Sequence, residues 1–183
     1  MSMRKLLLAA ASCVLLIGAA HAESTLGKPG TPHLGTPITP GDIAAWDLAI
    51  GPDGAGLPPG SGTAKQATQL FVDKSASCHG LDLMGKPADR LVGGQGTLAA
   101  PGAVKTVGSY WPYATTLFDF IRRAMPLNEP QSLTNDEVYK LSAYILFKNG
   151  IIGEDAKMDA KSLAKVKMPN RDGFVQIYPG NIK

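Results

Sequence analysis

Proline and glycine decide where regular structure can form in this chain of 183 residues. The sequence contains 14 prolines and 21 glycines, and they recur every few positions in GKPGTPHLGTPITPG and in GPDGAGLPPGSG. Proline fixes φ and lacks a backbone donor, whereas glycine leaves the backbone loose, so this composition favours irregular structure over a helix or strand. We therefore predict a Pro/Gly-rich arm over residues 23–62 and a compact region after it.

Three later segments place apolar residues at helical spacing. The first is TAKQATQLFVDK, residues 63–74, and the second runs from residue 115 to residue 124. In the third, Glu137 follows Thr134 by three residues, which is the pattern of a capping box at the start of a helix. No long stretch alternates with a period of two, as a half-buried strand would. The sequence therefore predicts a small all-α domain over residues 63–149.

The segments that flank this domain carry weaker signals. Within the arm, a short helix is expected over residues 40–50, where Trp46 and Ile50 share one face and are predicted to dock the arm onto the domain. The tail, residues 150–183, is expected to wrap the domain mostly in loops, with a short helix after Asp159.

Residues 1–22 have the three parts of a secretory signal peptide. Arg4 and Lys5 precede an apolar run, and the segment ends in the small-x-small pattern Ala20-His21-Ala22. The alternative is an uncleaved membrane anchor, for which the apolar run falls short of the usual length of about 20 residues. We predict cleavage after Ala22, export to the periplasm and a mature protein without a membrane span.

Removing this signal changes the charge balance and the cysteine count. The chain has 18 basic and 15 acidic residues, and 16 basic residues remain once the two in the signal are gone. A nearly neutral protein is a poor candidate for binding nucleic acid, which needs a clustered basic surface. Cys13 leaves with the signal, so Cys78 is the single cysteine of the mature chain. A lone cysteine in an exported protein calls for an explanation: either it joins another group covalently, or it is an exposed free thiol.

The sequence around that cysteine is half of a haem-attachment motif. A complete Cys-x-x-Cys-His joins two thiols to the haem vinyl groups, and the adjacent histidine reaches the iron. Here the segment reads Ser75-Ala76-Ser77-Cys78-His79, so a hydroxyl stands in place of the first thiol. A serine forms no thioether, which leaves one attachment point.

A second iron ligand is expected from a methionine, since histidine and methionine together suit an electron-transfer haem. Met125 is the best placed, because it follows the second predicted helix and precedes Pro126, which holds the backbone extended. Met84 follows His79 too closely to reach the opposite face of a haem. The alternative for Met125 is a side chain that fills a gap in the core.

Other sites that use a cysteine and a histidine fit this sequence less well. A structural zinc site needs four ligands, whereas the mature chain offers one cysteine and the two histidines His33 and His79. A nucleophilic cysteine needs a histidine that faces it, and adjacent residues on a helix point in different directions.

The order of these features resembles class I cytochromes c over residues 63–149. Three stretches, residues 56–62, 107–119 and 168–174, resemble more narrowly the cytochrome subunits or domains of sulfite and sulfane dehydrogenases. In such systems a molybdenum subunit oxidises the sulfur compound and passes single electrons to the haem. The resemblance therefore implies an electron-transfer protein with a molybdenum-containing dehydrogenase subunit and a downstream cytochrome as partners.

The resemblance also implies roles for individual residues. Cys78 would hold haem c through a single thioether, with His79 as the proximal and Met125 as the distal iron ligand. Pro87 or a nearby backbone carbonyl would orient the His79 ring. The remaining implied haem contacts are Leu91, Tyr110 and Trp111 along the haem and Arg90 at a propionate.

Two positions depart from the family pattern, and two other functions stay open. Ser75 removes the second thioether, and Ala67 stands where the family usually has glycine at a helix crossing. The first alternative is a haem-free subunit that keeps the fold and docks on a partner. The second is a peroxidase-like or ligand-sensing haem protein in which Met125 does not bind iron.

Overall fold

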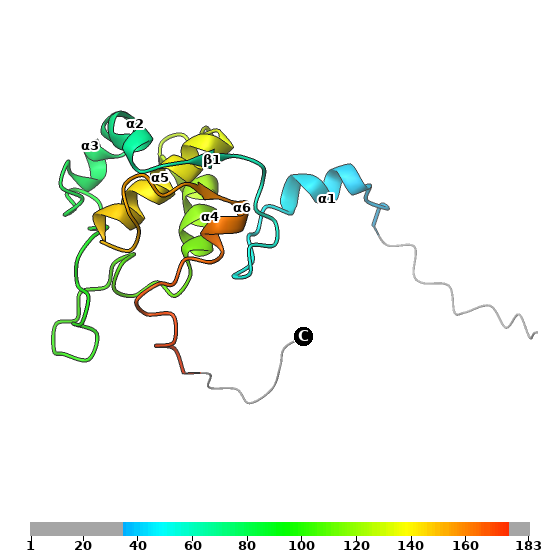
Figure 1. The fold of residues 1–183 in the computed structure, drawn as a ribbon. Helices are drawn as coiled ribbons and strands as arrows, with labels where there is room; N and C mark the ends of the chain where they lie inside the picture. Colours follow the sequence, from blue (N-terminus) through cyan, green and yellow to red (C-terminus); the bar gives the residue numbers. More distant parts are fainter. Residues whose placement is uncertain (1–34, 176–183) are drawn as a thin grey trace, which may run out of the picture. The chain divides into compact units, whose positions relative to one another are not determined.

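The computed structural model describes residues 35–175 (Figure 1). The predicted signal peptide and the beginning of the arm therefore lie outside the described residues. Residues 35–39 form no regular element, and residues 40–175 lie in one compact unit. None of the helices within residues 35–175 has the length and apolar character that crossing a bilayer requires.

The regular structure of the compact unit is mostly helical. The helices are α1 (Pro40–Trp46), the 3-10 helix η2 (Lys65–Ala67), α2 (Thr68–Lys74), α3 (Ala76–His79), α4 (Ala114–Ala124), α5 (Asn135–Lys148) and α6 (Ala160–Leu163). Two strands, β1 (Ser61–Gly62) and β2 (Met158–Asp159), pair antiparallel with Ser61 opposite Asp159 and Gly62 opposite Met158.

This small sheet departs from the all-α expectation, and it joins the end of the arm to the tail. Each strand has two residues, too few to show a period of two in the sequence. Gly62 permits the pairing, because a Cβ at this position would lie 2.8 Å from the backbone nitrogen of Lys140 on α5. The arm can therefore pass this close to α5 only where the chain lacks a side chain.

Helix α5 lies at the centre of the core, in contact with α2, α4 and the sheet (Figure 1). Its predicted start is confirmed, since the Thr134 hydroxyl accepts from the Glu137 backbone and the Glu137 carboxylate accepts from the Thr134 backbone. Tyr139 of α5 packs on Phe118 of α4, with ring centroids 4.4 Å apart. One apolar helix is thus wrapped on several sides by the others.

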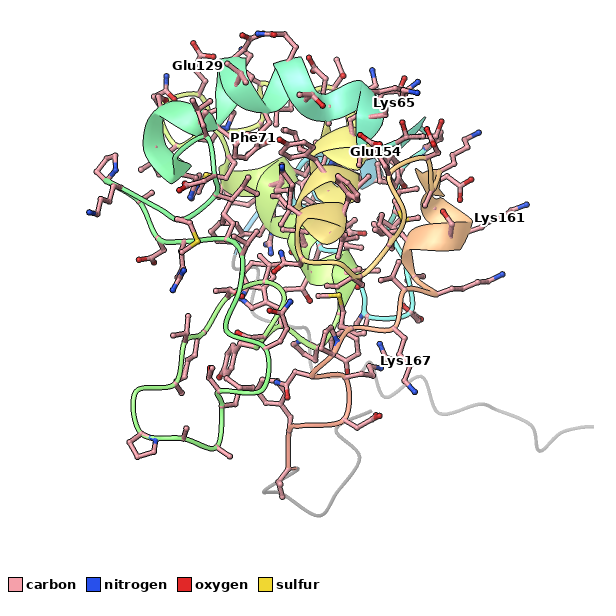
Figure 2. The ribbon with its side chains drawn as sticks, turned by 60° about the vertical axis from the view of Figure 1, so that its left-hand side comes forward. Lys65, Phe71, Glu129, Glu154, Lys161 and Lys167 are labelled. Atoms are coloured by element: carbon pink, nitrogen blue, oxygen red, sulfur yellow. The ribbon has the colours of Figure 1, made fainter. Side chains whose placement is uncertain are left out.

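The first predicted helix is divided in the structure into η2 and α2, and the half motif that follows it forms the separate short helix α3. Phe71 of α2 points into the core (Figure 2), where its ring centroid lies 5.0 Å from that of Tyr144 on α5. Ala67 is fully buried where η2 meets α5, so the methyl group that departs from the family pattern is accommodated in the core. Ser75 joins α2 to α3 in a non-helical conformation and turns the chain between them.

The arm helix differs from its prediction in length and in contacts. It ends at Trp46, and the backbone N–H of Ile50 donates to Asp119 on α4 rather than to a helical carbonyl. Trp46 is 89% exposed, so the prediction that this residue docks the arm is wrong. Ile50 does pack against the core, so the arm is held beyond its helix rather than by it.

The tail contributes to the core more than its loops suggest. The short helix expected after Asp159 is confirmed as α6, and the Asp159 side chain caps it by accepting from two backbone N–H groups. Three tail residues are buried in the same apolar cluster as the helices: Met158, Leu163 and Met168. The compact unit therefore includes the tail through residue 168.

Candidate functional site

A cavity of about 350 Å³ opens among α3, α4, α5 and two loops, residues 88–91 and 105–107. Its size lies in the usual range for cofactor and ligand pockets, about 300 to 1,000 Å³. Apolar side chains from α4 and α5 form much of the wall, including Leu117, Ile121, Leu141 and Ile145. The polar and charged residues gather on α3 and on the loops.

The structure brings six of the seven predicted site residues to this cavity. They are Cys78, His79, Arg90, Leu91, Trp111 and Met125. Tyr110 is not among the lining residues; its ring packs instead against Phe174, with centroids 5.2 Å apart, and the Lys105 amine lies 5.1 Å from its centroid. The cavity therefore joins residues that the sequence separates by almost fifty positions.

Cys78 lies on α3 as an exposed free thiol at the edge of the cavity. Ser75 lines the same cavity one turn earlier. Both positions of the half motif thus border one space, although only Cys78 offers a sulfur that could form a thioether. Ser75 offers a hydroxyl instead, and a hydroxyl forms no thioether.

His79 ends α3 and is held by the loop that follows it. Its Nδ1 lies 2.8 Å from the backbone carbonyl oxygen of Asp89. A carbonyl oxygen only accepts, so in the neutral ring this bond selects the tautomer with the proton on Nδ1 and the lone pair on Nε2. A histidine held in this tautomer is prepared to bind a metal through Nε2.

Backbone hydrogen bonds fix the loop that carries Asp89 to α3. The N–H of Ala88 donates to the Cys78 carbonyl at 2.9 Å, and the N–H of Gly85 donates to the His79 carbonyl at 2.8 Å. The sequence suggested Pro87 or a neighbouring carbonyl as the orienting group, and the structure identifies Asp89. No residue type marks a backbone acceptor, so the sequence could give only its neighbourhood.

Met125 occupies the position directly after α4. Its backbone is extended, with φ −121° and ψ 145°, as expected for a residue before proline. The side chain is half-buried, lines the cavity and packs against the core. A thioether sulfur and an imidazole are therefore both present in the walls of one cavity.

Arg90 has incompletely satisfied donors at the cavity wall. Within the part of the chain that the structure describes, its Nε is buried without a hydrogen-bond partner. Its Nη2 donates to the Met84 sulfur at 2.9 Å, and a thioether is a weak acceptor. The guanidinium can therefore still receive an anionic group such as a carboxylate.

Sequence reasoning missed several residues of the site. Lys74, Lys105 and Thr106 line the cavity from the polar side, and Phe120 packs edge-on against Trp111 with centroids 5.8 Å apart. Aromatic residues are common in ordinary cores and basic residues are common on ordinary surfaces, so nothing in the sequence distinguished these residues.

The residues of the cavity do not form a conventional metal site. Among residues 35–175, no three His, Cys, Asp or Glu side chains gather closely enough to hold a metal ion. One imidazole and one thioether fit a metal that brings most of its own ligands, such as the iron of a porphyrin.

The comparisons with known proteins connect the chain to sulfur oxidation. No protein-family model matches the chain, and no curated protein matches it. One chain of the sulfane dehydrogenase SoxCD from Paracoccus pantotrophus matches with 41% identity and a TM-score of 0.75, over 82% of this chain and 73% of that one. The chain belongs to the family of this sulfane dehydrogenase chain. The predicted link to sulfur dehydrogenase subunits is thereby confirmed for the SoxCD family.

Proposed function

We propose that the chain is a periplasmic monohaem c-type cytochrome that carries electrons for a molybdenum-containing sulfite or sulfane dehydrogenase and passes them to a downstream cytochrome. The observation that carries this proposal is the shared cavity of Cys78, His79 and Met125, with the His79 proton held on Nδ1. Membership of the SoxCD family supports the choice of a sulfur dehydrogenase as partner.

The residues present fit a haem. Apolar side chains of α4 and α5 would exclude water from its faces, and Cys78 would attach it through a single thioether. The buried and unpaired Nε of Arg90 would receive a propionate carboxylate. When bound, the haem supplies an iron that accepts and releases one electron.

The chain's own residues would supply the iron ligands that set the reduction potential of the haem. His79 would bind iron through Nε2, because the Asp89 carbonyl holds the proton on Nδ1. Met125 would supply its thioether sulfur as a second iron ligand, and a methionine sulfur raises the reduction potential. The proposed role is electron transfer alone, and the breaking and forming of substrate bonds is left to the partner dehydrogenase.

The proposed location depends on residues 1–22, which lie outside the described residues. Their basic start, apolar centre and small-x-small end support export with cleavage after Ala22. Covalent haem attachment in the periplasm is consistent with the single cysteine of the mature chain.

The test is a visible spectrum of the exported protein, purified from a host that matures c-type cytochromes. We expect a Soret band of a six-coordinate haem that changes on chemical reduction and returns on oxidation. A folded protein without a Soret band would instead identify a haem-free docking subunit. A spectrum typical of an open coordination position would favour the peroxidase-like or ligand-sensing alternative.

A further inference from the structure

Asn149 follows α5, and its side chain bonds to a loop far away in the sequence. Its Nδ2 donates to the carbonyl oxygen of Leu91 at 3.1 Å and to that of Ile145 at 2.8 Å. Its Oδ1 accepts from the backbone N–H of Gly93 at 3.3 Å. One amide therefore ties the end of α5 to both sides of the peptide segment 91–93.

These bonds exceed what the end of a helix needs. The backbone N–H of Asn149 already donates to Ile145 at 3.2 Å and closes the last turn. The bonds to Leu91 and Gly93 span 58 and 56 residues of sequence, so they connect separate parts of the fold.

Neighbouring segments pack closely around Asn149 and around the segment 91–93 that it contacts. Its backbone carbonyl accepts from the Gln95 side chain at 3.0 Å. A Cβ at Gly108 would overlap the Asn149 amide and would lie 2.8 Å from Gln95 Nε2, so only glycine admits this contact. From the other side, Thr106 donates to the carbonyl of Gly93 at 2.6 Å.

The segment that Asn149 holds continues directly to the acceptor for His79. Asp89, whose carbonyl receives the His79 Nδ1 proton, lies two residues before Leu91. Arg90 and Leu91 both line the cavity. A shift of Leu91 would therefore move the Asp89 carbonyl relative to the imidazole.

We propose that Asn149 is a positioning residue for His79. By fixing Leu91 and Gly93 to the end of α5, it holds the Asp89 carbonyl against the Nδ1 proton and so sets the tautomer that leaves Nε2 free for a metal. The role of His79 as an iron ligand rests on the proposed function, whereas the orientation of the ring by Asn149 does not.

The test compares two asparagines that donate to loop carbonyls. Asn149→Asp keeps the acceptor for Gly93 and loses the donor to Leu91, while Asn149→Ala removes both without adding charge. Asn170→Asp is the matched control, because Asn170 donates to the carbonyl of Tyr110, which does not line the cavity.

The measurement is proton NMR of the protein as purified and fully reduced, at one fixed pH. It follows the exchange of the His79 Nδ1 proton with solvent, beside the exchange of backbone amides in α5. We expect the Nδ1 proton to exchange about tenfold faster in either Asn149 variant than in the wild type, and unchanged in Asn170→Asp. Amides in the middle of α5 should accelerate much less, whereas a purely structural role would accelerate both together.

Equal Nδ1 exchange in the wild type and the folded Asn149 variants would overturn the proposal, as would equal acceleration of the α5 amides. The proposed function is read separately from the visible spectrum of the same samples. A haem-free protein whose Nδ1 exchange still depends on Asn149 would refute the cytochrome and leave this inference standing. A haem protein whose Nδ1 exchange does not depend on Asn149 would support the cytochrome and refute this inference.

Discussion

Arg90 places a positive charge at the cavity wall with its Nε–H unpaired among residues 35–175. In the haem-loaded protein, Arg90→Gln should lower the reduction potential by on the order of 30 mV, because removing a nearby positive charge disfavours the reduced iron. The measurement is a redox titration followed by visible absorption. Lys161→Gln is the charge-matched control, since Lys161 extends outward from α6 (Figure 2) and does not line the cavity.

An Arg90→Gln potential equal to that of Lys161→Gln would show that Arg90 does not approach the haem. The guanidinium would then be an ordinary cavity-wall charge, and its unpaired Nε would need another explanation.

A substitution at Met125 distinguishes an iron ligand from a side chain that only fills the core. Met125→Leu keeps the volume of the side chain but removes the sulfur, so the reduction potential should fall by at least about 0.1 V and an open coordination position should appear in the spectrum. Met168→Leu is the matched control, because Met168 is fully buried in the core and does not line the cavity. If both variants leave the spectrum unchanged, Met125 is a core residue and the peroxidase-like alternative gains support.

At the scale of elements, two contacts hold the arm where its composition predicts no regular structure. Asp119 of α4 accepts from the N–H of Ile50 and pairs with Arg123 on its own helix. The Tyr139 hydroxyl of α5 donates to the carbonyl of Pro58 at 2.9 Å. Side chains from the helices thus add to the backbone pairing of β1 with β2 in ordering this Pro/Gly-rich segment.

The Tyr139 contact predicts a dependence of stability on alkaline pH. Burial raises the pKa of the Tyr139 hydroxyl from 10.0 to about 12. Because the folded-state pKa lies above the unfolded value, the folded protein holds this proton more tightly, and its contribution to stability is complete below pH 10 and is lost as pH rises toward 12. Urea unfolding midpoints should therefore decline more steeply over this range in the wild type than in Tyr139→Phe.

The comparison with Tyr139→Phe cancels the contributions that the two proteins share at alkaline pH. Parallel pH profiles for the two proteins would mean that the Tyr139 hydroxyl loses its proton equally readily in the folded and unfolded chain. At neutral pH, Tyr139→Phe should itself cost about 1 kcal/mol through the lost bond to Pro58.

Elements whose signals are local could be predicted from the sequence, and elements that depend on distant partners could not. The capping box at Thr134 and the proline after Met125 fix helix ends through neighbouring residues, and both ends are found where expected. The prediction that Trp46 docks the arm was wrong because the apolar face of a helix does not reveal whether another segment covers it. Asp89 was missed as the acceptor because a backbone carbonyl carries no residue-type signal.

At the scale of the whole molecule, the tail completes the core. Met158, Leu163 and Met168 are buried with the helices, although the tail was expected to wrap the domain mostly in loops. The contacts of the tail join residues far apart in the sequence, and the periodicity within one segment does not reveal such contacts. The cavity residues were easier to anticipate, because the half motif and Met125 carry their own chemistry.

The central claim for the whole molecule is that Cys78 alone anchors a haem. Ser75 lines the same cavity as Cys78, so Ser75→Cys would offer a second thiol to the same group. A second thioether should slow the loss of haem under denaturant, whereas Cys78→Ser should leave the haem without any covalent bond.

The most direct measurement is the intact mass of the exported protein, before and after extraction with acidified acetone, for the wild type, Ser75→Cys and Cys78→Ser. We predict that the wild type and Ser75→Cys each retain the mass of one haem through extraction, and that Cys78→Ser emerges as the bare polypeptide. A wild-type protein with the mass of the polypeptide alone would contradict the account.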